Sequence, residues 1–308
     1  MTQIKPLPKA LQKIAKDELF EDPSRIPKDL ETFKLWIEQQ PHLKVRMDEQ
    51  FLIQFLRGCK YSMEKAKEKI DQYYTLKTKY PNILGVYDVD NERFRQTRRL
   101  GTIVALPKPL NGNGCRIMVG HMNYNPDEYT FEELLRPIVA LYELFTIYDP
   151  YTSICGVRTI IDVSKLTMAQ VLHVNVSQLK TAVNFFEKSL PLRIKAIYYV
   201  NIPPVANSFF KIVFPLFSEK LRQRIFLCGT VEDLKQHIPV EYLPQYYGGS
   251  NGSMEEHIQD LNAKYDEHWH FFKDNANYGI DETLRQTETL SGDNLFGAGG
   301  SFRKMEVD

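Results

Sequence analysis

The sequence is poor in the features that build disulfide frameworks, zinc sites and membrane spans. Its 308 residues include only four cysteines, and none of them forms a Cys-x-x-Cys pair, which disfavours both a zinc knuckle and a disulfide scaffold. Lys and Arg total 39, as do Asp and Glu, so no overall charge is available to hold a nucleic acid. The most apolar stretch, residues 209–217, is interrupted by Lys211 and Pro215, whereas a spanning helix needs about 20 apolar residues.

The N-terminal twenty residues lack the apolar core of a secretory signal, because lysines interrupt them throughout. We therefore expect a cytoplasmic chain with reduced cysteines. No cofactor or metal site is predicted. His268 and His270 are two residues apart on a predicted helix and point to different sides, and no complete glycine-rich phosphate loop is present. Hydrophobic residues make up 43% and charged residues 25% of the chain, which is typical of a folded globular protein.

The first 85 residues carry helical patterns and no strand pattern. Asp48 and Ser62 stand where the N-caps of two helices are expected. Pro81 is expected to end the last helix, because proline has no N–H group to donate. Residues 1–85 are therefore predicted to form an all-helical N-terminal domain.

From about Val86, short apolar runs alternate with helical stretches. A capping box at Thr130 and Glu133 opens one of these helices. Strands that alternate with helices predict a mainly parallel sheet with helical crossovers, so residues 86–250 are predicted to be an α/β domain. The five expected strands are residues 102–106, 116–120, 157–162, 195–201 and 224–228.

The C-terminal region, residues 251–308, is acidic, with twelve acids and five bases. A helix is expected at about residues 254–272, followed by an irregular acidic tail that is either packed on the surface or loose.

The segment from Pro191 to Arg224 departs most from the neutral composition of the chain. It contains six bases and one acid, together with Pro203-Pro204 and an apolar run. Two interpretations remain open from composition. One is a core helix with a solvated basic rim, and the other is an amphipathic element that lies on a bilayer with its bases toward anionic headgroups.

The segment Gly248-Gly249-Ser250-Asn251-Gly252 has the letter pattern of a hydrolase nucleophile elbow. That reaction requires the serine on a turn between a central strand and a helix, with a histidine and an acid to activate it. Pro244 stands where the strand would be, and a central strand does not tolerate proline. A glycine-rich exit from the domain is the favoured interpretation, and no catalytic residue is assigned.

Several separated motifs resemble the CRAL-TRIO (Sec14-like) lipid-binding family over about residues 25–270. The resemblance is nearest to the branch of α-tocopherol transfer and retinaldehyde-binding proteins. The ending GSFRK, residues 300–304, is similar to arthropod members of that branch. The motifs that carry the family resemblance are DEQFLIQFLRGCKYSMEKA at 48–66, SLPLRIK at 189–195, NIP at 201–203, LFSEKL at 216–221 and LPQYYGG at 243–249.

The resemblance implies a pocket that is floored by the sheet, holds one lipophilic molecule and is closed by a mobile helical gate at about residues 203–217. It also implies a cluster of basic residues that binds phosphoinositide headgroups. The implied gate residues are Phe209, Phe210, Val213 and Phe214. Phe209 and Phe210 are expected to face outward or toward a bilayer in some state. The positions that match the basic cluster are Arg193, Lys195, Lys220 and Arg224.

The expected pocket is apolar and aromatic, which suits a long hydrophobic ligand with few polar groups to orient it. Tocopherol binders have small hydroxyl side chains on the helix where this chain has the bulkier Ile138 and Tyr142. This difference puts tocopherol in doubt as the ligand. A retinoid, a carotenoid, a sterol-like molecule or another prenyl lipid is an equal candidate. The pocket candidates are Ile138, Tyr142, Phe145, Val157, Phe185, Phe186, Leu190, Ile194, Ile212 and Phe217.

We therefore predict a soluble, monomeric carrier that is not an enzyme and that transfers a lipophilic small molecule between membranes. Its expected partners are that ligand and phosphoinositide-containing membranes, with reversible peripheral association and no nucleic acid. Two alternatives remain. One is a non-catalytic scaffold or regulatory lipid sensor that acts through the acidic C-terminal region, and the other is a lipid hydrolase that uses Ser250.

Overall fold

The computed structural model describes residues 4–285. Its N-terminal lobe is helical, as predicted. The Asp48 side chain caps α3 by accepting a hydrogen bond from the Phe51 N–H at 2.8 Å, whereas Ser62 precedes α4 without a side-chain cap. Pro81 follows the end of α4 and also begins the next helix. The helices of the lobe are α1 (Lys9–Leu19), α2 (Ile26–Glu38), α3 (Glu49–Gly58), α4 (Met63–Lys79) and α5 (Pro81–Leu84).

The lobe also contains a two-residue strand, β1 (Leu43–Lys44), which helical periodicity did not predict. It pairs antiparallel with β7 (Gly279–Ile280), so the segment after the C-terminal helices returns to the N-terminal lobe. Arg285 extends this contact by donating to the Asp71 carboxylate at 2.8 Å. The expected tail beyond residue 285, including the GSFRK ending, lies outside the described residues.

The five expected strands are confirmed, with each end within one residue of its predicted position. They form one sheet in the order β2-β3-β4-β5-β6. Strand β2 is antiparallel to β3, and the remaining neighbours are parallel, as the alternation of strands and helices predicted. The strands are β2 (Ile103–Ala105), β3 (Arg116–His121), β4 (Val157–Asp162), β5 (Ile194–Val200) and β6 (Ile225–Cys228).

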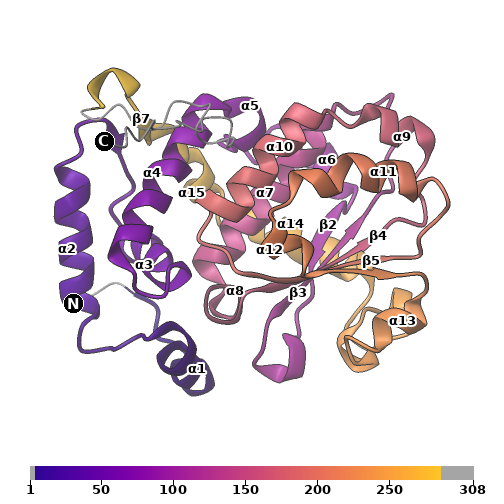
Figure 1. Cartoon of the computed structure of the whole chain (residues 1–308), viewed down its shortest axis with the longest axis horizontal. Coiled ribbons are helices and arrows are strands. Elements are labelled where there is room, and N and C mark those ends of the chain that lie inside the picture. The colour runs from indigo at the N-terminus through magenta and orange to yellow at the C-terminus, as the bar shows by residue number, and fades with distance from the viewer. Residues whose placement is uncertain (1–3, 286–308) are drawn as a thin grey trace, which may run out of the picture.

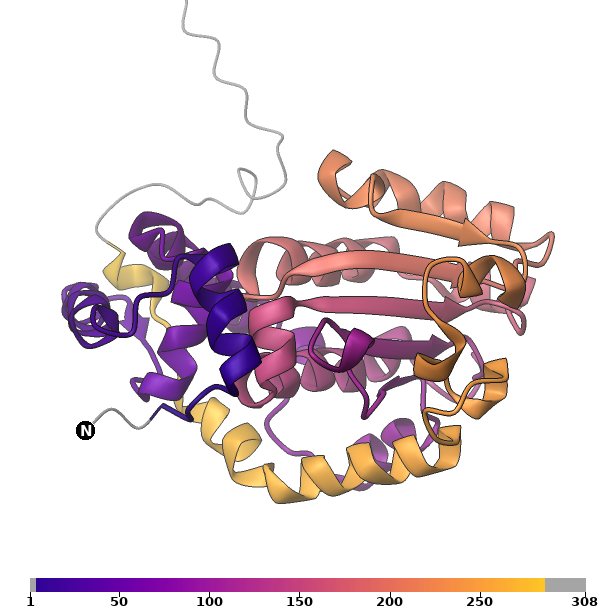
Figure 2. The same cartoon turned by 90° about the horizontal axis from the view of Figure 1, so that it is seen from below.

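Helices cover both faces of the sheet. Figure 1 shows α7, α10 and α11 on one side and α13 on the other, and α14 runs along the β2 edge (Figure 2). The expected C-terminal helix is divided at His268. The helices of this part are α6 (Glu92–Arg99), α7 (Phe131–Tyr148), α8 (Pro150–Cys155), α9 (Met168–His173), α10 (Val176–Asn184), α11 (Ala206–Val213), α12 (Glu219–Arg222), α13 (Val231–Lys235), α14 (Met254–Glu267) and α15 (Trp269–Asp274).

The capping box predicted at the start of α7 is present. The Thr130 hydroxyl accepts from the Glu133 N–H at 3.3 Å, and the Glu133 carboxylate accepts from the Thr130 N–H at 2.8 Å. Because this box satisfies two N–H groups at the helix start, it determines where α7 begins over the sheet.

A buried carboxylate at the end of β4 joins the sheet to the segment LPQYYGG. Asp162 is buried and accepts hydrogen bonds from the Tyr247 hydroxyl and the Asn201 amide, both at 3.0 Å. The Ser164 N–H donates to its other oxygen at 2.9 Å. A buried carboxylate needs such donors to offset the loss of its hydration.

We expect Tyr247→Phe to lower the free energy of unfolding by about 1.5 kcal/mol, because it removes one hydrogen bond to a buried charge. Urea unfolding of both proteins measures this difference. Tyr246→Phe is the matched control, since Tyr246 is the adjacent tyrosine and its side chain is largely exposed. Equal losses of stability in the two variants would contradict the role given to the Tyr247 hydroxyl.

Candidate functional site: an apolar cavity beside a basic cleft

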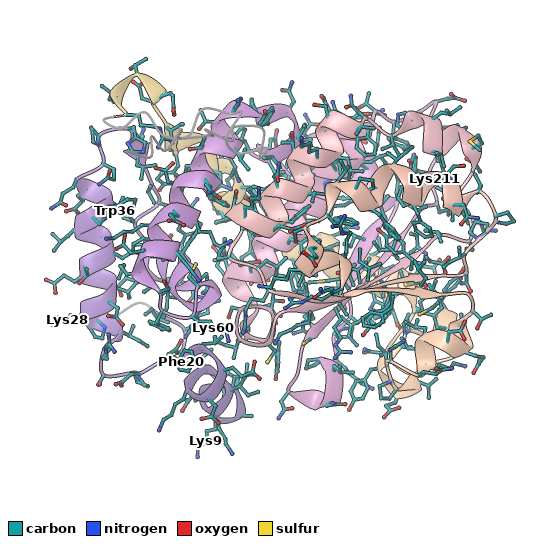
Figure 3. All side chains as sticks on the ribbon, viewed as in Figure 1. Lys9, Phe20, Lys28, Trp36, Lys60 and Lys211 are labelled. Atoms are coloured by element: carbon teal, nitrogen blue, oxygen red, sulfur yellow. The ribbon has the colours of Figure 1, made fainter. Side chains whose placement is uncertain are left out.

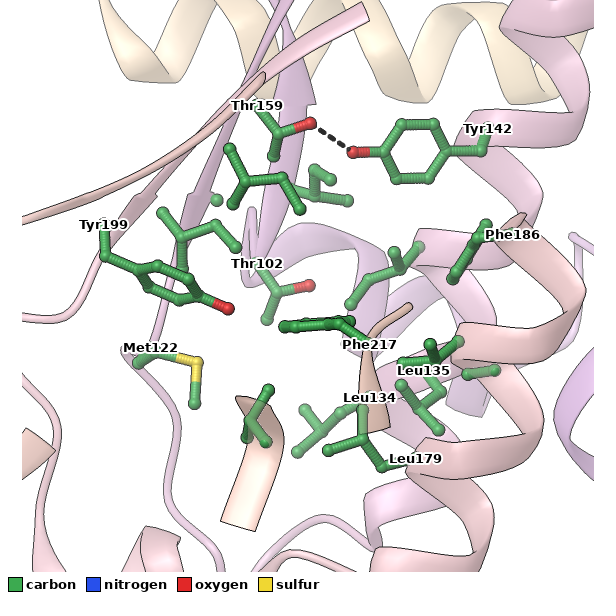
Figure 4. A pocket seen from close by; sticks show the side chains of 18 of the residues that line it. Thr102, Met122, Leu134, Leu135, Tyr142, Thr159, Leu179, Phe186, Tyr199 and Phe217 are labelled. Atoms are coloured by element: carbon green, nitrogen blue, oxygen red, sulfur yellow. Dashed lines mark hydrogen bonds between the residues drawn. The ribbon is translucent and has the colours of Figure 1, made fainter. Parts of the chain in front are cut away.

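The candidate ligand site is an apolar cavity of about 240 Å³ between one face of the sheet and helices α7, α10 and α11 (Figure 4). Leu134, Leu135 and Ile138 of α7 form one wall, and Leu179, Ala182 and Val183 of α10 extend it. The residues that line the cavity include neither lysine nor arginine. Sites for drug-sized ligands usually measure ~300–1,000 Å³, so the cavity is small for a long ligand in the conformation described.

Helix α11 and the turn that follows it close the cavity. Phe209 and Val213 of α11 line it, as does Phe217. Phe210 lies against the ring of Tyr199 with a centroid distance of 5.0 Å and stacks on Phe214 at 4.8 Å.

The structure therefore holds the gate phenylalanines inward, against the sheet. Phe209 and Phe210 are 8% and 7% exposed, while the next residue, Lys211, is exposed on the solvent side of α11 (Figure 3). The outward or bilayer-facing arrangement expected for these residues is not the one in the structure and stays a prediction.

Half of the ten pocket candidates line the cavity, namely Ile138, Tyr142, Phe186, Ile194 and Phe217. The Tyr142 hydroxyl is paired with the Thr159 hydroxyl at 2.7 Å, and burial raises the pKa of Tyr142 to about 12, so it stays protonated.

The other five candidates lie elsewhere. Phe145, Val157, Phe185 and Leu190 are buried in the main core, and Ile212 packs, half-buried, on the apolar cluster of the gate. Phe185 turns toward the N-terminal lobe, where its ring is 5.6 Å from that of Tyr73. Val157 is on the same face of β4 as Thr159, but it stands at the start of the strand, beyond the end of the cavity.

A second hollow, which we call the basic cleft, lies between the N-terminal lobe and the α/β domain and has a volume of about 670 Å³. All four residues predicted for the phosphoinositide cluster line it. Its acidic residues are Glu68 and Glu187. The bases that line the basic cleft are Lys60, Lys65, Lys69, Lys188, Arg193, Lys195, Lys220 and Arg224.

The basic cleft concentrates positive charge in partly dehydrated surroundings. Burial lowers the pKa of Lys69, and the nearby charge of Lys220 lowers it further. Burial also lowers the pKa of the Arg193 guanidinium, whose Nε is buried without a hydrogen-bond partner among the described residues. Arg224 is held in place by donating to the Ile194 carbonyl. An anion in the cleft would stabilise the charged forms of these groups.

The cavity and the basic cleft share a wall. Phe186, Glu187, Leu192, Ile194 and Leu221 line both. The Glu187 carboxylate accepts from the Ser218 N–H at 3.2 Å, so the turn after the gate is hydrogen-bonded to this wall.

Sequence reasoning missed the contribution of the N-terminal lobe to the basic cleft. Lys60, Lys65 and Lys69 are more than a hundred residues from Arg193 in the chain, and only the fold brings them together. Their helical spacing on α4 shows that Lys65 and Lys69 share a face, but no local signal shows what that face meets.

An exposed apolar group next to the gate was also missed. Met168, Leu172 and Val176 are 50%, 80% and 46% exposed, and we call them the apolar rim. Val171 of α9, the helix that carries Met168 and Leu172, belongs to the apolar cluster that contains Phe209 and Phe210, so the rim lies beside the gate.

Ser250 lies in a different setting from the one a nucleophile elbow requires. It follows a 3₁₀ turn, Gln245–Tyr247, and its hydroxyl donates to the Glu241 carbonyl at 3.4 Å. Within residues 4–285, no histidine forms a hydrogen bond with Ser250. The same residues contain no cluster of His, Cys, Asp or Glu that could hold a metal ion, and none of their helices is long and apolar enough to cross a membrane.

Comparisons with known proteins show which protein families this chain is similar to. A family model described as "CRAL/TRIO domain" matches residues 110–249, and one described as "Pinta-like, UBA domain" matches residues 22–94. The protein of Homo sapiens named "Alpha-tocopherol transfer protein-like" is 25% identical over 244 residues, which are 78% of this chain and 70% of that protein. "Clavesin-2" of Rattus norvegicus is 29% identical over 245 residues, 79% of this chain and 74% of that protein.

Among solved structures, the crystal structure of Sfh5 aligns with 87% of this chain and 99% of its own at 11% identity and a TM-score of 0.48. The arthropod origin suggested by the GSFRK ending stays a prediction. The matched domain spans the strands β3 to β6 and the gate that enclose the cavity, and this chain therefore carries a CRAL/TRIO domain at residues 110–249.

Proposed function

We propose that this protein is a carrier that binds one lipophilic small molecule in the apolar cavity and transfers it between membranes. The observation that carries the proposal is the cavity, which is walled by apolar side chains and closed by the apolar face of a single short helix, α11. Removing a lipophilic molecule from water is favourable roughly in proportion to the apolar area buried. One relative bears the name of a transfer protein, which agrees with this function.

The membrane is proposed to be the trigger for opening. If α11 moved outward in water, Phe209, Phe210 and Phe214 would be exposed to solvent at a cost set by their apolar area. At a bilayer the same side chains would enter an apolar environment instead. A ligand-exchange state is therefore favoured at the membrane and disfavoured in the cytoplasm, where we place the free carrier.

The basic cleft is proposed to bind phosphoinositide headgroups and so to make the carrier selective for membranes that contain them. Its lysines and arginines come from two lobes and meet in one hollow, which is the arrangement that several phosphate groups on one headgroup require. Arg193 and Arg224 offer planar donor pairs, and the lysines act as point charges. Because Phe186, Glu187, Leu192, Ile194 and Leu221 line both hollows, headgroup binding is proposed to favour gate movement.

The apolar rim beside the gate provides a test of transfer at the membrane. We expect Met168→Asp with Leu172→Asp to slow transfer of a fluorescent lipophilic probe between vesicles about tenfold, because two exposed apolar side chains no longer enter the bilayer. Binding of the same probe without vesicles should be unchanged. The transfer rate is measured by energy transfer between donor and acceptor vesicles.

Leu35→Asp is the matched control for the apolar rim, since Leu35 is 53% exposed but lies on α2 in the N-terminal lobe, far from the gate (Figure 1). It should leave the transfer rate unchanged. Equal slowing by the control and by the rim variant would show a general effect of added charge and would contradict the role of the rim. A scaffold with a vestigial cavity, the alternative function, would take up no probe at all.

A further inference from the structure

Three residues with a left-handed backbone lie together where the end of α1 meets the turn after α3. Phe20 has a φ of 64°, and Lys60 and Tyr61 have φ values of 53° and 58°. Among residues 4–285, the other residues with positive φ, glycines aside, are two asparagines, which tolerate this conformation better than bulky residues do. Phe20 ends a helix at the position that glycine usually occupies. Strain of this kind is found where surrounding contacts enforce it, often at functional sites.

A buried ion pair enforces the turn at Phe20. The next residue, Glu21, is buried, and its carboxylate accepts from the Arg57 guanidinium at 2.7 Å and 3.0 Å. The Tyr61 hydroxyl donates to the same carboxylate at 2.9 Å. The turn directs Glu21 into the N-terminal lobe and leaves the Phe20 side chain 69% exposed. A glycine at position 20 would make the same turn without strain, so the fold does not explain the phenylalanine.

Lysines surround the exposed ring of Phe20. The Lys60 Nζ atom lies 5.8 Å from the centre of the ring. Lys9, Lys13 and Lys16 are exposed on α1, and their spacing of four and three residues places them on one face of the helix that ends at Phe20. In Figure 3, Lys60, Phe20 and Lys9 follow one another along one side of the N-terminal lobe.

This surface continues into the basic cleft. Lys60 itself lines the cleft. Glu18, in the last turn of α1, approaches Lys195 of the cleft at 3.5 Å. Asp17 and Glu18 are the acids of α1 against its three lysines, and Glu18 faces a base of the cleft. The exposed ring therefore lies beside the cleft, on a surface with an excess of positive charge.

We propose that Phe20, Lys60 and the lysines of α1 form an N-terminal anchor that binds the headgroup region of an anionic bilayer. This inference rests on the membrane association in the proposed function and adds a second contact, separate from the gate and the apolar rim. The anchor holds the N-terminal lobe on the bilayer, so that the basic cleft beside it meets the headgroups whether or not the gate is open.

A bilayer suits the anchor better than a protein partner does. A phenylalanine enters the boundary between headgroups and acyl chains while the surrounding lysines reach toward the phosphate groups. A stable protein interface requires a larger contiguous surface with an apolar centre, whereas here one ring stands among charged side chains.

The variant Phe20→Gly separates the anchor from the fold. We expect it to bind vesicles of phosphatidylcholine and phosphatidylserine about tenfold less tightly in co-sedimentation, because an apolar ring no longer enters the bilayer. Vesicles of the same total charge that contain phosphoinositide should show an equal loss, since the ring distinguishes no headgroup. The same variant should raise the midpoint of urea unfolding, because glycine adopts the left-handed conformation without strain.

Leu35→Ala is the matched control for vesicle binding. Leu35 is 53% exposed on α2 and does not line the basic cleft, so its truncation should leave vesicle binding unchanged. Uptake of a lipophilic probe without vesicles should be the same in the unmodified protein, the control and the Phe20→Gly variant.

A tryptophan at position 20 reports whether the side chain enters the bilayer. The fluorescence of Phe20→Trp, compared with that of the unmodified protein and its two tryptophans, should shift to shorter wavelength on vesicles and be quenched by lipids brominated in the upper acyl chain. Leu35→Trp should show no quenching beyond that of the unmodified protein.

The outcomes distinguish failure of the anchor from failure of the carrier function. Unchanged vesicle binding by Phe20→Gly, a lower unfolding midpoint of that variant, or no quenching at position 20 would each overturn the anchor and leave ligand binding in the cavity standing. If the unmodified protein takes up the probe but binds no vesicle, the anchor and the membrane step of the proposed function both fail. If vesicle binding depends on Phe20 but no probe is taken up, the anchor stands and the carrier function fails.

Discussion

Replacing Phe186 with aspartate is expected to reduce the affinity for a lipophilic ligand at least a hundredfold. Phe186 lines the cavity and lies against Tyr142 with a ring-centroid distance of 5.2 Å. A carboxylate at this position must either lose its hydration or be neutralised when a ligand fills the cavity, and both cost several kcal/mol. Equilibrium titration with a fluorescent lipophilic probe in the absence of vesicles measures the loss.

Two further variants show whether the cavity itself is responsible. Leu35→Asp adds the same charge at an exposed position of α2 and should leave the affinity unchanged. Phe186→Ala enlarges the cavity without adding charge, so it should shift the preference toward bulkier ligands. A folded Phe186→Asp protein with normal affinity would show that the ligand binds elsewhere.

Reversing two charges of the basic cleft, by Lys195→Glu with Lys220→Glu, is expected to weaken binding to phosphoinositide vesicles by about 30-fold or more. Each basic residue near an anionic surface contributes ~1 kcal/mol, so losing two already corresponds to this factor. Both side chains line the cleft, and among residues 4–285 the ion pair of Lys195 is a weak, exposed one with Glu18 at 3.5 Å. Ligand binding without vesicles should persist.

The measurement is co-sedimentation with vesicles that are matched in total charge and differ in phosphoinositide content. Lys28→Glu with Lys273→Glu is the matched control, because both lysines are exposed and neither lines the basic cleft. Figure 3 shows Lys28 on the far side of α2. If the unmodified protein binds both kinds of vesicle equally, or if the control loses as much affinity as the cleft variant, the cleft attracts membranes by charge alone.

Raising the salt concentration should imitate the cleft variant, since exposed charges are screened over ~8 Å at physiological ionic strength. The part of the binding that comes from buried or paired contacts should resist salt more strongly. Arg193 is half-buried, with its Nε atom buried, and burial lowers the pKa of its guanidinium. Its contact with a phosphate group is therefore expected to be the most salt-resistant of the set.

The sequence by itself determined the five strands of the α/β domain and the start of the helix that Thr130 caps. All five strands and the capped start of α7 depend on short-range signals, namely apolar runs of strand length and the pair of Thr130 and Glu133. Local patterns also showed the excess of bases between Pro191 and Arg224. These features depend on residues that are neighbours in the chain, and their physical effects act at that range.

The tertiary structure decided which side chains meet. Phe185 and Phe186 are adjacent and chemically identical, yet one packs on Tyr73 and the other lines the cavity, because successive residues of a helical segment point in different directions. The lysines of α4 join the basic cleft only because the N-terminal lobe packs beside β5 and α12.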